Sequence, residues 1–137
     1  MAHGIRSGRR RRRGFTLVET LVVLTISMIV IAMAIPQYQK AVIRSRESVL
    51  HNNLQTLRES IDHYSYDKEK APQSLEDLVS EGYLRTIPLD PMTGTNQTWQ
   101  KVMEEASQSM TQTEPGIWDV HSGSDKIGLD GSHYSEW

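Results

Sequence analysis

Glu19 is the one formally charged residue in an apolar segment that runs from Phe15 to Pro36. The segment is long enough to span a bilayer, which needs about 20 mostly apolar residues. A carboxylate at the centre of a membrane helix costs roughly 2.5 to 3.5 kcal/mol, and less near an interface. Because Glu19 lies inside this segment, the chemistry expected of it is pairing with a partner group that offsets this cost.

Other residue types that could do chemistry form no recognisable catalytic pattern. The sequence has no G-x-S-x-G elbow, no G-x-x-x-x-G-K-[ST] phosphate loop and no H-E-x-x-H motif. His121 and His133 flank the C-terminal tail, and two histidines twelve residues apart there are more typical of surface residues than of metal ligands. We therefore predict that the chain is a substrate of enzymes and not an enzyme itself.

A basic block, Arg9 to Arg13, stands before Gly14 and the apolar segment. Short basic flanks resist translocation, so the block orients a spanning helix with its N-terminus in the cytoplasm. Everything after Pro36 should then lie beyond the inner face of the membrane.

The charge of the chain is divided unevenly. The first fourteen residues hold six arginines and no acid, and without them 9 basic residues remain against 17 acidic ones, a net charge of −8. Phosphate binding is driven by Lys and Arg, so this balance disfavours a nucleic-acid partner. The sequence has no cysteine, which excludes disulfides, thiolate zinc sites and a cysteine nucleophile.

The apolar segment is open to three simpler interpretations. The basic start and Ala32-Met33-Ala34 are parts of a Sec signal peptide, and Arg12-Arg13-Gly14-Phe15 partly matches the twin-arginine export pattern. Both are disfavoured because the apolar run exceeds the usual stretch of about 7 to 15 residues and would contain Glu19. A plain membrane anchor accounts for the segment but not for Glu19.

Beyond Pro36 the sequence predicts a continuing helix. Apolar residues recur at spacings of 4, 3, 4 and 3, the pattern of one helical face: Leu50, Leu54, Leu57, Ile61 and Tyr64. Roughly the same face is extended upstream by Tyr38, Val42 and Val49. No glycine occurs between Gly14 and Gly82, so one helix of about 50 residues could run on from the apolar segment, kinked at Pro36.

The chain after this helix is the cover expected for its apolar face. Ser74 with Asp77 three positions on is typical of a capping box, and Gly82 can end the short helix that follows. The stretch 86–96, TIPLDPMTGTN, indicates irregular turns.

Two strands are predicted near the C-terminus, at residues 99–106 and 116–121, although the first stretch could equally be helical. The polar stretch SQSMTQTE between them is expected to be a hairpin loop. Short strands laid on a helix make an α+β domain. Its core is expected to include the three tryptophans, Trp99, Trp118 and Trp137.

These residues carry a resemblance to a known family. RGFTLVE before the apolar run, Pro36 twenty-one residues after Phe15, and PQSLEDLVSEGYLRTIPLDPMTG resemble the type IV pilin-like proteins, and within them the major pseudopilins of type II secretion systems. The resemblance covers nearly the whole chain and implies a pilin-like α+β fold. It implies four segments: a cleaved basic leader (1–14), a transmembrane assembly helix (15–36), an amphipathic continuation (37–70) and a periplasmic head with a short helix and two or three antiparallel strands (71–137).

The resemblance also implies how the precursor is processed. In that family a prepilin peptidase cuts after the glycine and methylates the new N-terminus, so cleavage falls between Gly14 and Phe15. Glu19 becomes the fifth mature residue, which in this family is thought to meet the N-terminal amine of a neighbouring subunit. Pairing a lipid-buried carboxylate with an ammonium group offsets its desolvation. Gly14 and Phe15 are thus the expected processing residues, and Glu19 and Pro36 the expected assembly residues.

The implied function is that of a filament subunit. Subunits related by a helical, non-closing contact build a filament, here a pseudopilus that pushes folded proteins through an outer-membrane channel. The implied partners are further copies of the chain, prepilin peptidase, other pseudopilins, an inner-membrane assembly platform and, before assembly, membrane lipid. The alternatives are a type IV pilus subunit for adhesion, motility or DNA uptake, and an exported binding protein with a simple signal or anchor.

Calcium is the one cofactor that the resemblance suggests. Major pseudopilins often bind it in a C-terminal loop through aspartates and backbone carbonyls, ligands that suit a hard cation. Asp125 and Asp130, with Ser122 nearby, are the candidates. The tail is shorter than the family pattern, Lys126 stands where glycine is common, and DKIGLDG does not fit the EF-hand pattern. The alternative is that both aspartates simply make turns.

Overall fold

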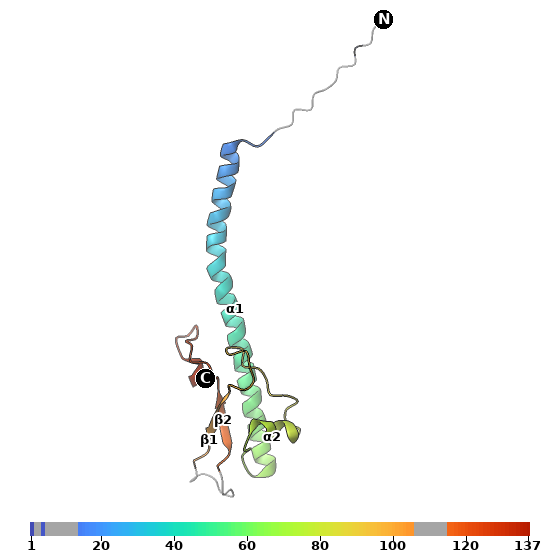
Figure 1. The fold of residues 1–137 in the computed structure, drawn as a ribbon, viewed down its shortest axis with the longest axis vertical. Helices are drawn as coiled ribbons and strands as arrows, with labels where there is room; N and C mark the ends of the chain where they lie inside the picture. The colour runs from blue at the N-terminus through green and yellow to red at the C-terminus, as the bar shows by residue number, and fades with distance from the viewer. Residues whose placement is uncertain (2–3, 5–13, 106–114) are drawn as a thin grey trace. The chain divides into compact units, whose positions relative to one another are not determined.

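The computed structural model describes residues 1, 4, 14–105 and 115–137. The predicted leader falls largely outside these ranges, and the predicted hairpin loop SQSMTQTE wholly outside them. The chain divides into two compact units, Met1–Gln39 and Lys40–Trp137, and each is described by itself. The described residues form these elements (Figure 1): α1 (Leu17–Lys68), α2 (Leu75–Ser80), β1 (Gln100–Met103), β2 (Ile117–His121) and the 3-10 helix η1 (Tyr134–Glu136).

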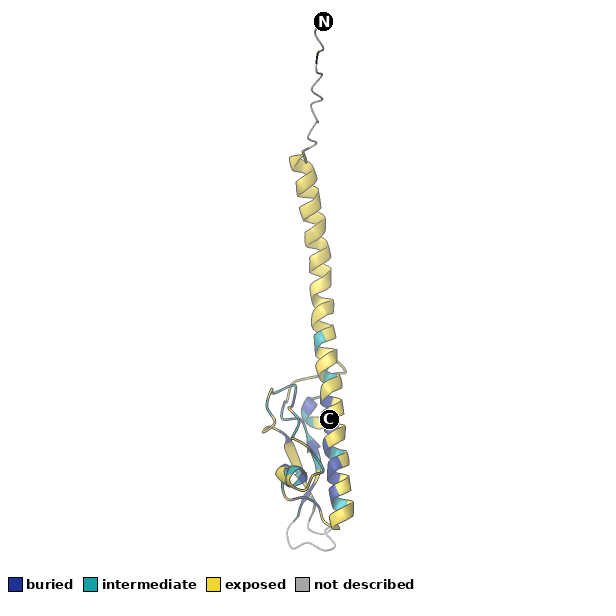
Figure 2. Ribbon diagram, turned by 90° about the vertical axis from the view of Figure 1, so that its right-hand side faces the viewer, coloured by how far each residue is buried: buried dark blue, intermediate teal, exposed yellow. Residues whose placement is uncertain are grey.

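Helix α1 begins directly after a capping threonine. The Glu19 amide donates to Thr16 Oγ1 at 3.1 Å, and the Thr20 amide donates to the Thr16 carbonyl at 3.1 Å. Such a cap satisfies an amide that has no partner within the helix. In the first unit every described residue is exposed, and Figure 2 shows this part of α1 yellow throughout. Within the described ranges, α1 is the one helix long and apolar enough to cross a membrane.

In the second unit α1 carries the core. The predicted apolar stripe is confirmed, because its members are all buried: Leu50, Leu54, Leu57, Ile61 and Tyr64. They form one cluster with Leu75, Leu78, Trp99, Ile117, Val120 and Tyr134. Fully burying a leucine contributes about 1.5–3 kcal/mol, so this stripe is what attaches the rest of the unit to α1. Val49, expected on roughly this face, is exposed, since it lies about 100° around the helix from Leu50.

Helix α2 has the predicted ends. Asp77 N donates to Ser74 Oγ at 3.3 Å and Ser74 N donates to Asp77 Oδ2 at 2.9 Å, which completes the capping box. Gly82 follows the helix with φ at 84°, the left-handed region where glycine has no steric penalty. The helix places Leu75 and Leu78 in the core.

The two strands pair antiparallel, as predicted. The register joins Gln100 to His121 and Met103 to Ile117, with a bulge between Val102 and Met103. Residues 100–103 therefore form a strand, which decides against the helical alternative for this stretch. The predicted layout of one long helix, one short helix and a small antiparallel sheet is confirmed.

The prediction that all three tryptophans lie in the core is wrong for Trp118. This side chain is 56% exposed, because Ile117 and Val120 occupy the inward positions of β2 and both are fully buried. Trp99 is buried, and its Nε1 donates to the Pro88 carbonyl at 2.8 Å. Trp137 packs against the core while partly exposed.

Candidate assembly site and C-terminal tail

The Glu19 carboxylate lies in the first turn of α1, where the helix dipole favours a negative charge. Glu19 is exposed and surrounded by apolar side chains such as Phe15, Val18 and Val22, each at least half exposed. No cation from the described part of the chain lies within ion-pair distance of this carboxylate. A cationic partner for Glu19 must therefore come from outside the described residues.

Gly14 and Phe15 precede the helix. Both are exposed and have no regular secondary structure, so the peptide bond between them is open to a protease. A Cβ added at Gly14 would meet nothing within 4 Å. The fold of the described residues therefore does not need glycine here.

Pro36 lies inside α1 and is exposed. Proline has no amide hydrogen, so the carbonyl of Ala32 lacks its usual intrahelical donor. Gly14, Phe15 and Glu19 lie close together along the chain, in the first turn of α1 or just before it. Pro36 lies 17 residues beyond Glu19, about 25 Å along a helix, so the structure does not bring it to the same site.

The two calcium candidates lie in the C-terminal tail, the segment Ser122–Trp137. Asp125 Oδ1 accepts from Ser135 Oγ at 3.0 Å and lies 3.4 Å from His133 Nδ1. A hydrogen bond to the Asp125 carbonyl and the nearby carboxylate raise the pKa of His133. Asp130 Oδ1 accepts from the amide and the hydroxyl of Ser132, at 2.9 and 2.7 Å, and these bonds lower the pKa of Asp130.

These residues do not fit a calcium site. Calcium takes six to eight oxygen ligands, whereas Asp130 accepts from Ser132 within a turn and Asp125 accepts from Ser135 across the tail. Ser122, expected nearby, instead donates to Asp90 Oδ2 at 2.7 Å. The described residues contain no group of three or more His, Asp or Glu placed to hold a metal ion. The alternative prediction, that the aspartates make turns, fits Asp130, whereas Asp125 contacts Ser135 and His133 across the tail.

Sequence reasoning missed three polar residues that organise the second unit. Arg58 donates from Nε to Asp119 Oδ1 at 2.7 Å, and its Nη2 donates to the carbonyls of Val120 and Trp137. Asp90 is fully buried. Glu47, half-buried on α1, accepts two hydrogen bonds from the tail.

Asp90 has a sequence signal that could have found it. It stands between two prolines in PLDPMTG, a stretch already assigned to turns. Its carboxylate accepts from Met92 N at 2.8 Å and from Gly123 N at 3.0 Å, besides Ser122. A buried carboxylate is tolerated when its oxygens are satisfied in this way. The aspartate therefore ties the turn to the start of the C-terminal tail.

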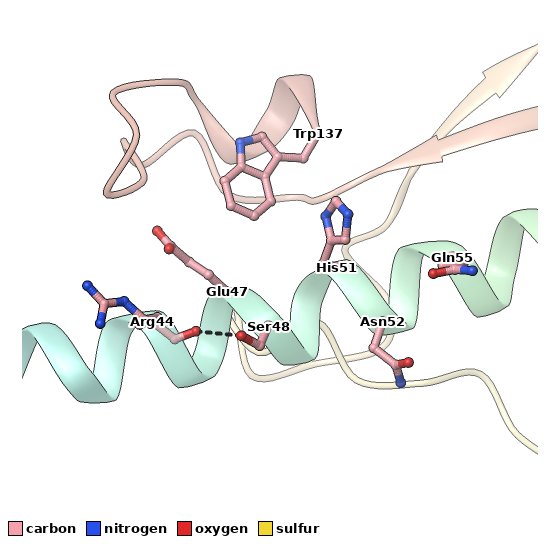
Figure 3. Close-up of a pocket in the computed structure, with 7 residues that line it drawn as sticks. All are labelled: Arg44, Glu47, Ser48, His51, Asn52, Gln55 and Trp137. Atoms are coloured by element: carbon pink, nitrogen blue, oxygen red, sulfur yellow. Dashed lines mark hydrogen bonds between the residues drawn. The ribbon is translucent and has the colours of Figure 1, made fainter.

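An open hollow of about 480 Å³ lies between α1 and the end of the tail (Figure 3). Six residues with polar or charged side chains line it from α1, with one tryptophan opposite: Arg44, Glu47, Ser48, His51, Asn52, Gln55 and Trp137. The Ser48 hydroxyl donates to the Arg44 carbonyl at 3.0 Å, so it is used within the helix. His51 meets Trp137 edge-on with ring centroids 6.1 Å apart. The hollow has the composition of a wet surface groove, not of an enclosed catalytic pocket.

The family comparison matches the start of the chain. Residues 9–35 match the prokaryotic N-terminal methylation motif. This match includes the basic block, Gly14, Phe15 and Glu19, the residues that the sequence singled out. The motif at the start of a long exposed helix, followed by an α+β head, defines the class of type IV pilin-like proteins.

Curated relatives extend the similarity into the head. Type II secretion system core protein G of Pseudomonas aeruginosa is 30% identical over 99 residues, which cover 61% of this chain and 70% of the relative. The core protein G of Dickeya chrysanthemi is 25% identical over 148 residues, covering 90% and 97%. The chain belongs to the family of type II secretion system core protein G, the major pseudopilins.

A relative named for a different assembly also matches. The type IV major fimbrial protein FimA of Dichelobacter nodosus is 37% identical over 62 residues, which cover 45% of this chain and 39% of the relative. No solved structure matches the chain.

Proposed function

We propose that this chain is a structural subunit of the pseudopilus of a type II secretion system. Prepilin peptidase would cleave between Gly14 and Phe15 and methylate the new N-terminus. The observation that carries the proposal is Glu19, a carboxylate in the apolar, exposed first part of α1, with no cationic partner among the described residues. The amine of a neighbouring Phe15 supplies the missing charge.

The exposed apolar surface of the first unit supports assembly. Its large side chains are 50–83% exposed between Phe15 and Ile35. Fully burying a large apolar side chain contributes about 1.5–3 kcal/mol relative to leaving it in water, and less where the side chain is already partly covered. Lipid covers this surface before assembly and other copies of the helix cover it afterwards.

The proposed topology follows from the charge of the leader. The N-terminus lies in the cytoplasm, residues 15–36 cross the bacterial inner membrane, and residues 37–137 form the periplasmic part. The subunit then moves into a pseudopilus with the help of other pseudopilins and an inner-membrane assembly platform. Its acidic body is consistent with protein partners and not with nucleic acid.

Replacing Glu19 with alanine tests the proposal. Glu19→Ala removes the docking charge without adding bulk, so we expect membrane insertion to continue and filaments to be absent from electron micrographs of cells that overproduce the chain. Thr20→Ala is the control, because Thr20 Oγ1 donates only to the Thr16 carbonyl within the same turn. Normal filaments from Glu19→Ala would contradict the proposal.

A type IV pilus subunit is the second candidate, favoured by the match to FimA. Deleting the gene in its native host separates the two functions. Loss of protein secretion with normal surface pili supports the secretion pseudopilus. Loss of surface pili with normal secretion supports the second candidate, and in either case a plasmid copy of the gene should restore the lost function.

A further inference from the structure

The C-terminal tail is closed by its own hydrogen bonds. Gly128 N donates to the Ser132 carbonyl at 2.8 Å and Gly131 N donates to the Gly128 carbonyl at 3.1 Å. Inside this turn, Asp130 Oδ1 receives both donors of Ser132. Gly131 has φ at 88°, as the turn requires. Asp130 Oδ1 and the carbonyls of Gly128 and Ser132, oxygens that a cation could use here, therefore already accept protein donors.

The two arms of the tail are joined in the same way. Ile127 and His133 form an isolated antiparallel bridge, and Tyr134 N donates to the Lys126 carbonyl at 3.0 Å. His133 Nδ1 lies 2.8 Å from the Asp125 carbonyl oxygen. Residues 125–127, before the turn, are thus joined directly to residues 133 and 134, after it.

Glu47 of α1 connects this closed tail to the core. Its Oε1 accepts from Leu129 N at 2.7 Å and from the Tyr134 hydroxyl at 2.9 Å. A Cβ at Gly128 would lie 3.1 Å from Glu47 Oε1, tighter than ordinary contact, so glycine lets the carboxylate approach the turn. Hydrogen bonds to a charged acceptor are about twice as strong as neutral ones.

We propose that the tail of this chain folds without a divalent cation and that Glu47 holds it in place. The Glu47 carboxylate of α1 organises the turn by accepting from the Leu129 amide and the Tyr134 hydroxyl. A bound cation would organise a loop the other way, by gathering carboxylates and carbonyls around itself. The proposal concerns this chain's fold and does not depend on its role in secretion.

Calcium titration of the processed, full-length chain in detergent micelles tests the cation half of the proposal. We expect the same Tm in EGTA and in millimolar calcium chloride, and no saturable heat of binding. A cation present at about 100 times its Kd would raise the Tm of a domain of this size by about 10 °C or more. Such a rise, removed by Asp125→Asn or Asp130→Asn, would overturn the proposal.

Hydrogen exchange at the Leu129 amide tests the role of Glu47. We expect Glu47→Ala to speed this exchange by at least about tenfold, equally in EGTA and in calcium, because the charged acceptor is lost. Glu59→Ala is the matched control on the same helix, where Glu59 is exposed and accepts from Gln55. Unchanged exchange in Glu47→Ala, or exchange that calcium slows again, would overturn the proposal. If that variant fails to fold, the wild-type calcium titration still decides between the two accounts.

Discussion

The two units of the chain use apolar side chains in opposite ways. Between Leu17 and Gln39 apolar residues surround α1 on all sides and every one is exposed. From Leu50 to Tyr64 they form a single stripe, and that stripe is buried. A helix that is apolar all round is covered by lipid or by other chains, whereas a one-sided stripe is covered within its own domain. The contrast separates assembly from folding along one continuous helix.

The largest expected effect comes from a residue with no role in the fold. Gly14→Leu should block cleavage, so that mass spectrometry of membrane protein finds an uncleaved leader instead of a methylated Phe15. The Tm of the second unit should not change, because nothing lies within 4 Å of a Cβ at Gly14.

Gly4→Ala is the control for this variant, since Gly4 is equally unencumbered in the leader. A methylated Phe15 start from Gly14→Leu would contradict the prediction. An Ile35 start in the wild-type chain would mean that ordinary signal peptidase cuts after Ala34, and it would remove the pilin interpretation altogether.

A pair of leucine truncations tests the contrast directly. Leu57 is fully buried and Leu24 is 55% exposed on the same helix. We expect Leu57→Ala to lower the stability of the second unit by about 2–5 kcal/mol, the range for buried leucines. Leu24→Ala should leave that stability unchanged and weaken filament assembly instead.

The readouts for this pair are thermal unfolding in detergent and the yield of sheared filaments. If Leu24→Ala lowered the Tm as much as Leu57→Ala, the division of labour between the two regions of α1 would be wrong.

Arg58 is expected to have a smaller effect because it is partly exposed. Arg58→Met keeps the apolar stem and removes the donors to Asp119, Val120 and Trp137. We expect a loss of about 1–3 kcal/mol, the range for hydrogen bonds to charged groups and for acceptors left without a donor.

A double-mutant cycle with Asp119→Asn apportions this loss, measured by urea unfolding. A coupling free energy near zero between Arg58 and Asp119 would show that Arg58 acts through the two carbonyls and not through the ion pair. That outcome would refine the prediction without contradicting it. A fully stable Arg58→Met would contradict the prediction.

Local rules explain what the sequence predicted well. The buried stripe follows from 3.6-residue periodicity, and the ends of α2 follow from Ser74, Asp77 and Gly82, whose partners lie within a few residues. Gly14, Phe15 and Glu19 stand out because their spacing before an apolar run is itself the signal, and their roles stay predictions. In each case the determining contacts are close in the sequence.

Long-range contacts explain what the sequence did not predict. The partners of Glu47 lie 82 and 87 residues away, and those of Arg58 lie 61 to 79 residues away. Nothing in their local sequence marks these residues as different from other charged positions on α1. Trp118 was placed in the core because strand propensity does not say which face of β2 is buried. The calcium candidates were suggested by family resemblance, whereas their partners depend on how the tail folds.

Replacing Tyr134 is expected to have the smallest effect, a change in how stability depends on pH. It tests the burial that distinguishes the second unit from the exposed first unit. Burial, followed by the hydrogen bond to Glu47, raises the pKa of Tyr134 to about 12 from its ordinary value of 10.0. A raised folded-state pKa contributes stability that is fully present below pH 10 and is lost as the pH rises toward 12. The alkaline side of the stability profile should therefore fall more steeply in the wild-type chain than in Tyr134→Phe, which has no hydroxyl to ionise.

Carbon-13 NMR of labelled tyrosine follows this group directly. We expect Glu47→Ala to lower the pKa of Tyr134 only part of the way to its ordinary value, because burial is the larger cause and most of it remains. Glu59→Ala should leave it unchanged. A wild-type Tyr134 that ionises near pH 10 would show that water reaches the ring and that the tail is not packed on α1 as described. It would also remove the contrast with the exposed apolar helix, since the C-terminal end of the molecule would then be open to solvent as well.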